Sequence, residues 1–236
     1  MQAVILAGGK GTRLRPYTAI LPKPLMPMGD MPILEVVIRQ LKQSGFTEVI
    51  MAVGHLASLI EAYFGDGARW GIKIRYSREE TPLGTAGPIA LIDRLRAPFL
   101  VMNGDVLTNL DYRQFISYHL QQDSVATIAT YNKAVDITLG VIEVTDEDDI
   151  YDYIEKPTLH YRVSMGIYAF SEQVLQYIEA GKYLDFPDLI KLLLAKEEPV
   201  KGYPFEGTWL DIGRKEDYEQ ALKIFEDSHY EFLAQS

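Results

Sequence analysis

The chain has 236 residues, a formal net charge of −10 and no cysteine. Without cysteine, neither a disulfide framework nor a thiolate metal site can form. The acidic excess argues against nucleic acid as a partner, because phosphate backbones attract clustered lysine and arginine. No apolar stretch approaches the length of a membrane span, and the first residues lack the basic segment of a signal peptide. We therefore expect a cytoplasmic protein that contacts neither membranes nor nucleic acid.

The first hundred residues alternate between strand-like and helix-like patterns. Residues 2–7 form an apolar run that ends in two glycines, as a buried strand entering a loop would. A helical spacing from Ile33 ends at Gly45, and further strand and helix patterns lie at 48–53, 56–64, 72–76 and 98–102. This alternation predicts an α/β fold with a mostly parallel, mixed sheet and helices on both faces.

The second half begins with strand patterns at 124–131, 139–144, 150–154 and 163–170 and then returns to helical patterns at 172–178, 185–194 and 215–233. The aromatic-rich end, Phe225 to Phe232, is expected to pack against the domain or against a second subunit, so a homo-oligomer remains open. No internal repeat, low-complexity segment or linker interrupts the pattern, which predicts a single domain over residues 1–236.

A glycine-rich loop follows the first predicted strand. Gly8, Gly9 and Gly11 would let backbone N–H groups approach phosphate oxygens, and Arg13 adds a fork of charged donors. The spacing of a Walker loop is absent, and a dinucleotide fingerprint would need glycine where Leu14 stands. The alternative is a flexible surface turn, but the position directly after the first strand favours a phosphate-binding loop.

Three charged residues complete a candidate reaction centre. Lys23 lies between two prolines, which stiffen the backbone and aim its amine in one direction. Asp105 follows the apolar run 98–102, and Asp211 is flanked by apolar residues, so either carboxylate could hold a hard cation. Each aspartate alone could equally be a turn or cap residue. Together with a phosphate loop, the two aspartates favour a divalent-ion site.

Six segments occur in one characteristic order: 5–14, 22–25, 82–87, 103–105, 155–157 and 209–213. In this order they resemble the sugar-1-phosphate nucleotidyltransferases, most of all the mannose-1-phosphate and heptose-1-phosphate guanylyltransferases. The resemblance implies a Rossmann-like nucleotide-binding core at roughly 1–110 and 195–236. It also implies a sugar-binding portion at roughly 111–194.

The resemblance also assigns roles to residues. It implies catalytic roles for Arg13, Lys23, Asp105 and Asp211, with Mg²⁺ held by the two aspartates. The implied nucleotide contacts are Leu6, Ala7, Gly8, Gly9, Gly11, Thr12, Arg13, Glu79, Glu80, Gly84, Thr85, Asn103 and Gly104. The implied contacts to the sugar phosphate are Gly140, Glu155, Lys156, Ser164 and Gly166.

The implied reaction joins a nucleoside triphosphate to a sugar 1-phosphate and releases pyrophosphate. Guanine presents two adjacent donors that one carboxylate can accept together, so Glu79 and Glu80 favour GTP over UTP or dTTP. Ser164 stands where relatives often carry asparagine, and Leu139 stands where they carry an aromatic residue. Mannose, glucose and a heptose therefore remain open as the sugar. A non-catalytic nucleotide-sugar sensor and a kinase are the rival functions.

Overall fold

The computed structural model describes residues 1–233. Its centre is a seven-stranded sheet in the order β12-β8-β11-β6-β1-β4-β5. The strands are β1 (Gln2–Ala7), β4 (Glu48–Val53), β5 (Lys73–Arg78), β6 (Phe99–Asn103), β8 (Ala126–Asp136), β11 (Thr158–Phe170) and β12 (Val200–Phe205). Strand β11 runs antiparallel to β6 and β8, whereas the other neighbouring strands pair in parallel. The prediction of a mostly parallel, mixed sheet is confirmed.

Helices cover both faces of this sheet. On one face, α1 (Ile33–Gln43), α2 (Ala57–Phe64) and α3 (Tyr112–Gln121) pack into one apolar core. On the other face, α4 (Phe186–Ala195) packs with two 3-10 helices, η5 (Gly87–Leu91) and η6 (Glu172–Tyr177). Side chains of β1 alternate between the two cores, since Ala3 and Ile5 belong to the first and Val4 to the second. Helices on both faces are therefore confirmed.

A third apolar cluster lies under the last helix, α5 (Lys215–Phe232). Phe225 and Phe232 pack there with ring centroids 5.8 Å apart, against Met28 and Ile33. These two aromatic side chains therefore pack against the domain itself. The remaining short elements are β2 (Pro27–Met28), β3 (Met31–Pro32), β7 (Val106–Thr108), β13 (Trp209–Asp211), η1 (Thr12–Leu14), η2 (Tyr17–Ala19), η3 (Lys23–Leu25) and η4 (Ala68–Trp70). None of the described helices is both long and apolar enough to cross a bilayer.

Helix α3 and strand β12 are elements that the sequence patterns did not predict. Helix α3 carries a helical signature, because Asp111 caps it by accepting from the backbone N–H groups of Arg113 and Gln114 at 2.9 and 3.0 Å. Strand β12 contains a glycine and Pro204, which lower strand propensity. It is the edge strand of the sheet, where a missing backbone N–H is tolerated. The helix predicted at 172–178 is the shorter 3-10 helix η6.

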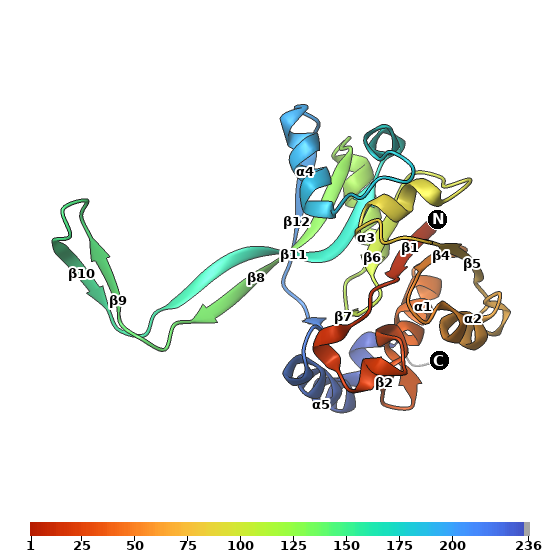
Figure 1. Cartoon of the computed structure of the whole chain (residues 1–236), viewed down its shortest axis with the longest axis horizontal. Helices are drawn as coiled ribbons and strands as arrows, with labels where there is room; N and C mark the ends of the chain where they lie inside the picture. The colour runs from red at the N-terminus through yellow and green to blue at the C-terminus, as the bar shows by residue number, and fades with distance from the viewer. Residues whose placement is uncertain (234–236) are drawn as a thin grey trace.

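Strands β8 and β11 continue beyond the sheet as a two-stranded ribbon that projects from the body of the molecule (Figure 1). At its outer end lies a small antiparallel hairpin of β9 (Val141–Val144) and β10 (Ile150–Ile154). We refer to residues 130–164 as the arm. The sequence analysis placed the start of β11 only at Val163, although Leu159, Tyr161 and Val163 alternate with polar residues as in a strand.

A buried charge network stabilises the amino-terminal edge of the sheet. Glu48 of β4 is 6% exposed, and it forms ion pairs with Lys73 at 3.0 Å and Arg75 at 2.8 Å. Burial alone would raise the pKa of Glu48, but hydrogen bonds from Gln2, Lys73 and Arg75 lower it to about 2. A carboxyl whose pKa is lowered by folding contributes stability above its ordinary pKa, and the contribution is lost as the pH falls toward 2.

We expect Glu48→Gln to lower the free energy of unfolding by about 2 kcal/mol at pH 7, because the charged form gains these contacts only in the folded state. The difference from the parent chain should shrink steadily between pH 5 and about pH 2. Urea denaturation at several pH values measures it, with Glu179→Gln as the control, since Glu179 is exposed and pairs with an exposed lysine. Equal stability of parent and variant at pH 7 would contradict this account.

Candidate active site

The loops after three parallel strands meet at one edge of the sheet. The register pairs Ala7 of β1 with Val53 of β4, and Leu6 of β1 with Asn103 of β6. The carboxyl ends of these strands are therefore level, which is where ligands bind in open α/β sheets. A pocket of about 810 Å³ lies there.

Most of the predicted nucleotide-binding residues line this pocket. Of the predicted residues, the lining includes Leu6, Ala7, Gly8, Gly9, Gly11, Arg13, Lys23, Glu79, Glu80, Gly84, Thr85, Asn103 and Asp105. Gly104 lies directly beneath, where its backbone N–H donates to the carbonyl of Leu6 at 2.9 Å. Thr12 begins η1 beside the glycine loop. Segments that are up to about a hundred residues apart in the sequence thus form one site.

Lys23 and Asp105 form an ion pair in the pocket wall. The ammonium of Lys23 contacts Oδ2 of Asp105, and Lys23 is only 9% exposed. Pro22 precedes it in an extended conformation and Pro24 follows within η3, so Lys23 lies between two residues with fixed φ. The second carboxylate oxygen of Asp105, Oδ1, is buried and has no hydrogen-bond partner among the described residues. A buried carboxylate oxygen without a partner is costly unless a cation or a ligand supplies one.

Asp211 approaches Asp105 from a second strand. Strand β13 pairs with β7 so that Asp211 lies opposite Val106, the residue after Asp105. Desolvation and the negative charge of Asp105 raise the pKa of Asp211, although its side chain still reaches solvent and Lys23 and Arg13 act in the opposite direction. Two neighbouring carboxylates that repel each other are a suitable donor set for a hard divalent cation. The described residues hold no group of three or more acidic or histidine side chains suited to a metal.

Glu79 lies between two sides of the pocket. One of its carboxylate oxygens accepts from the backbone N–H of Leu83 at 3.0 Å. The other lies so close to Gly8 that a Cβ there would be 2.7 Å from it, and Gly54 is nearly as near. Glycine at these positions therefore permits the close approach. Glu80, by contrast, is exposed and has no hydrogen bond among the described residues.

Several lining residues were not predicted from the sequence. Gly54 and His55 follow β4, and the rule that ligands bind after strand ends would have found them. Asp185 accepts from the backbone N–H of Thr85 at 2.9 Å and from the hydroxyl of Tyr183 at 2.6 Å. No local pattern marks Asp185, because its partner lies a hundred residues away and its own neighbours indicate a helix start.

The predicted sugar-phosphate residues fall into two groups. Gly166 lies against the pocket, since a Cβ there would be 2.6 Å from the side-chain nitrogen of Asn103. The hydroxyl of Ser164 accepts from the backbone N–H of Gly166 at 3.2 Å. Gly140, Glu155 and Lys156 lie on the outer part of the arm and do not line the pocket. The structure therefore does not bring these three to the pocket of their own chain.

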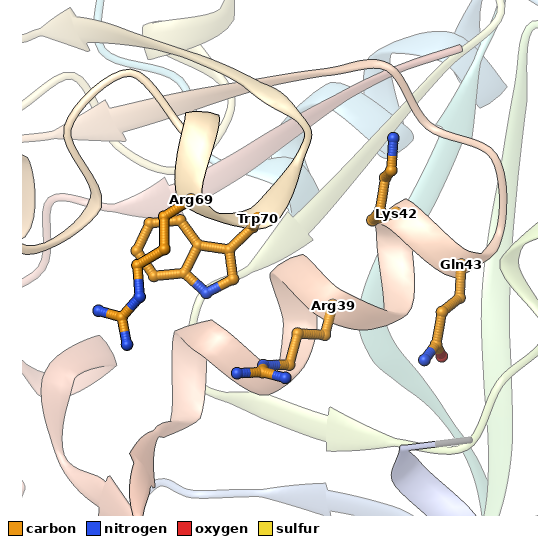
Figure 2. A pocket seen from close by; sticks show the side chains of 5 residues that line it. All are labelled: Arg39, Lys42, Gln43, Arg69 and Trp70. Atoms are coloured by element: carbon orange, nitrogen blue, oxygen red, sulfur yellow. The ribbon is translucent and has the colours of Figure 1, made fainter. Parts of the chain in front are cut away.

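A second, smaller hollow of about 270 Å³ is lined by Arg39, Lys42, Gln43, Arg69 and Trp70 (Figure 2). Its cations do not converge. Arg39 donates to Glu35 at 2.6 and 2.9 Å, Arg69 lies 5.1 Å over the ring of Trp70, and Lys42 points away from both (Figure 2). This hollow lies outside the predicted site and contains no candidate reaction centre.

Comparison with known proteins agrees with this arrangement. The family model described as nucleotidyl transferase matches residues 2–228. The chain is 35% identical to a UTP–glucose-1-phosphate uridylyltransferase of Synechocystis, over 94% of the chain and 63% of that protein. It is 33% identical to a mannose-1-phosphate guanylyltransferase of Mycobacterium tuberculosis, over 92% of the chain and 62% of that protein. The chain thus spans less than two thirds of the length of these relatives.

Among solved structures, HddC from Yersinia pseudotuberculosis, complexed with GMP-PN, superposes with a TM-score of 0.72 at 26% identity. The match covers 95% of this chain and 99% of that one. The resemblance noted from the six sequence segments is confirmed by both kinds of comparison. The chain belongs to the sugar-1-phosphate nucleotidyltransferase family.

Proposed function

We propose that this protein transfers a nucleotidyl group from a nucleoside triphosphate to a sugar 1-phosphate, with release of pyrophosphate. The observation that carries the proposal is the Lys23–Asp105 ion pair beside the glycine loop, with one Asp105 oxygen buried and unpartnered. A pure binding protein would have no need of an orphaned carboxylate next to Asp211. The glycine-rich loop lacks the spacing of a Walker loop, which disfavours a kinase.

The chemistry requires two anions to approach each other. An oxygen of the sugar phosphate attacks the α-phosphorus, a new P–O bond forms, and the bond from the α-phosphorus to the bridging oxygen of pyrophosphate breaks. The glycine loop and Arg13 would hold the triphosphate, and Lys23 would offset charge on the α-phosphate. Because the sugar phosphate is already ionised near neutral pH, no strong general base is needed, and no covalent enzyme intermediate forms.

The two aspartates suit a magnesium ion. Asp105 and Asp211 would hold it, with the rest of its shell left to water and phosphate oxygens. When bound, Mg²⁺ would neutralise charge on the α-phosphate and on the departing pyrophosphate. Burial and the charge of Asp105 raise the pKa of Asp211, and Lys23 and Arg13 offset part of that rise.

Pyrophosphate release tests this proposal. The chain would be assayed with magnesium, with GTP, UTP, dTTP, CTP or ATP, and with mannose, glucose or heptose 1-phosphate. We expect release only when both substrates are present. Nucleoside diphosphate as the product would support a kinase instead. Folded protein that binds nucleotide but releases no pyrophosphate with any pair would support the sensor function.

We further propose GTP as the preferred nucleotide. Glu80 is exposed, lines the pocket and has no competing hydrogen bond among the described residues, so its carboxylate can accept both edge donors of guanine. Glu79 already accepts from Leu83, which leaves it less free for this role. The relatives do not decide the base, since one is named for UTP and another for guanylyl transfer.

Glu80→Gln is accordingly expected to lower kcat/KM with GTP by about 10-fold, because the two edge donors of guanine lose a charged acceptor. The rate with UTP should change much less, so the preference for GTP over UTP should fall. Glu172→Gln, at an exposed site on η6, serves as the matched control. A parent enzyme that prefers UTP or dTTP would overturn the guanine proposal.

A further inference from the structure

The outer end of the arm exposes apolar side chains that belong to none of the three apolar clusters of the described residues. Six large side chains at its outer end, each between 49 and 73% exposed, are Leu139, Ile142, Val144, Ile150, Tyr151 and Tyr153. A two-stranded ribbon is marginally stable in water unless it packs against something else. Contiguous exposed apolar residues of this kind mark a surface that associates.

The direction of the arm is fixed by its pairing. The β8–β11 ladder runs without interruption from Thr158 opposite Asp136 to Ser164 opposite Thr130, and it carries the arm away from the body (Figure 1). No residue of the arm lines the pocket at the end of β1, β4 and β6. Folding the arm back over its own pocket would require a change at the irregular register between Ser164 and Tyr168.

The pocket is short of positive charge for the reaction proposed above. Three cations line it, Lys10, Arg13 and Lys23, against four carboxylates, Glu79, Glu80, Asp105 and Asp185. Lys23 is already paired with Asp105. Two polyanionic substrates must meet there, so a further cation beside the acceptor phosphate would lower the barrier. The pocket is also open, and covering it would exclude water.

The arm carries eight acidic and three basic residues, and one of the basic residues, Lys156, lies beside its outer hairpin. Lys156 has a side chain that is 66% exposed, and its backbone lies in the left-handed region at φ 48°, two residues after the end of β10. Five other non-glycine residues share a positive φ, so the exposure of its side chain is what makes the Lys156 ammonium available. The Nζ atom of Lys156 lies 3.5 Å from Oε1 of its neighbour Glu155, and Oε2 of Glu155 accepts a hydrogen bond from the hydroxyl of Tyr153.

We propose that the arm of one copy of this chain covers the pocket of a second copy and delivers Lys156 to the acceptor phosphate there. The inference rests on the proposed function. The arm is proposed to contact a second copy because the pocket of that copy needs a further cation beside the acceptor phosphate. Exchange of two arms about a two-fold axis would also serve both pockets and bury both apolar tips. Each active site would then be built from two chains.

Complementation between two inactive variants tests this exchange. Asp105→Asn disables the pocket and leaves the arm intact, whereas Lys156→Ala disables the arm and leaves the pocket intact. Each variant alone should lose at least about 10²-fold in pyrophosphate release. Co-expressed in equal amounts with different tags, they should recover about one quarter of the parent activity, because half of the dimers are mixed and each mixed dimer has one complete site.

The outcomes separate the two proposals. Activity in the parent without recovery in the mixture would overturn the exchanged arm and leave the proposed function standing, as would full activity of Lys156→Ala. Lys191→Ala is the control for loss of an exposed lysine, since Lys191 only pairs with Asp188 on α4. A parent chain that sediments as a monomer under assay conditions would also overturn the exchange.

A measurement independent of activity uses the absence of native cysteine. Chains bearing Lys156→Cys and chains bearing Glu80→Cys, with tags of different mass, would be mixed and treated with a short bismaleimide. We expect a covalent dimer that contains one chain of each kind. In a chain that bears both substitutions, a cross-link formed only within that one chain would show that the arm closes over its own pocket. That result would refute the exchange.

Discussion

Asp105→Asn is expected to lower kcat/KM for pyrophosphate release by about 10³-fold while the protein remains folded. The amide keeps the shape of the side chain, but it removes the charge that pairs with Lys23 and the oxygen that has no partner among the described residues. Steady-state kinetics measure the loss, and thermal unfolding checks the fold. Asp188→Asn, an exposed carboxylate on α4 that pairs with Lys191, is the matched control.

The two substrates should respond differently to Asp105→Asn. Nucleotide affinity should fall only modestly, because the glycine loop and Arg13 remain in place. Activity within a few-fold of the parent would contradict the assignment of Asp105 to the reaction centre. Loss of activity accompanied by unfolding would instead show that the Lys23–Asp105 pair is mainly structural.

Gly84→Ala is expected to destabilise the protein by at least about 2 kcal/mol more than Gly181→Ala. Both glycines have positive φ, 80° and 76°, so the conformational strain of alanine is similar at the two positions. The two positions differ in the room available for a Cβ atom. A Cβ on Gly84 would lie 2.5 Å from the carbonyl oxygen of Leu184, whereas nothing lies within 4 Å at Gly181.

The surroundings of Gly84 leave little room for relaxation. The carbonyl of Leu184 accepts from the backbone N–H groups of Ala86 and Gly87, and the N–H of Leu184 donates to Leu83. Urea denaturation measures both variants, and GTP binding to folded Gly84→Ala should be weakened because the loop lines the pocket. Equal stability of the two variants would show that this backbone contact is easily relieved.

Local patterns predicted the parts of the site that lie within short segments. The apolar run 2–7 followed by glycines predicted a loop that does line the pocket, and the prolines around Lys23 predicted a stiff segment, which has an extended entry and a 3-10 turn. The ion pair of Lys23 with Asp105 joins residues 82 positions apart, and the sequence did not predict it because no local pattern connects them. The sheet and its two helical faces followed from periodicity, because each buried face imposes its own repeat.

What the sequence did not predict depends on contacts between distant segments. Asp185 reaches Thr85 only because the loop 83–87 folds against Leu184. Strand β12 contains Pro204, and only its place at the sheet edge makes that residue acceptable. The direction of the arm is set by the length of the β8–β11 ladder, which the exposed residues 158–162 did not reveal. Gly140, Glu155 and Lys156 therefore lie where their predicted role requires a second chain or a different arm position.

Tracing labelled phosphorus tests the central claim most directly, because the claim specifies which bond breaks. With GTP labelled at the α-phosphate and an accepted sugar 1-phosphate, we expect the label in the nucleotide-sugar. With GTP labelled at the γ-phosphate, we expect it in pyrophosphate. Transfer of the γ-label to the sugar, or a stable α-label on the protein, would contradict direct attack of the sugar phosphate on the α-phosphorus.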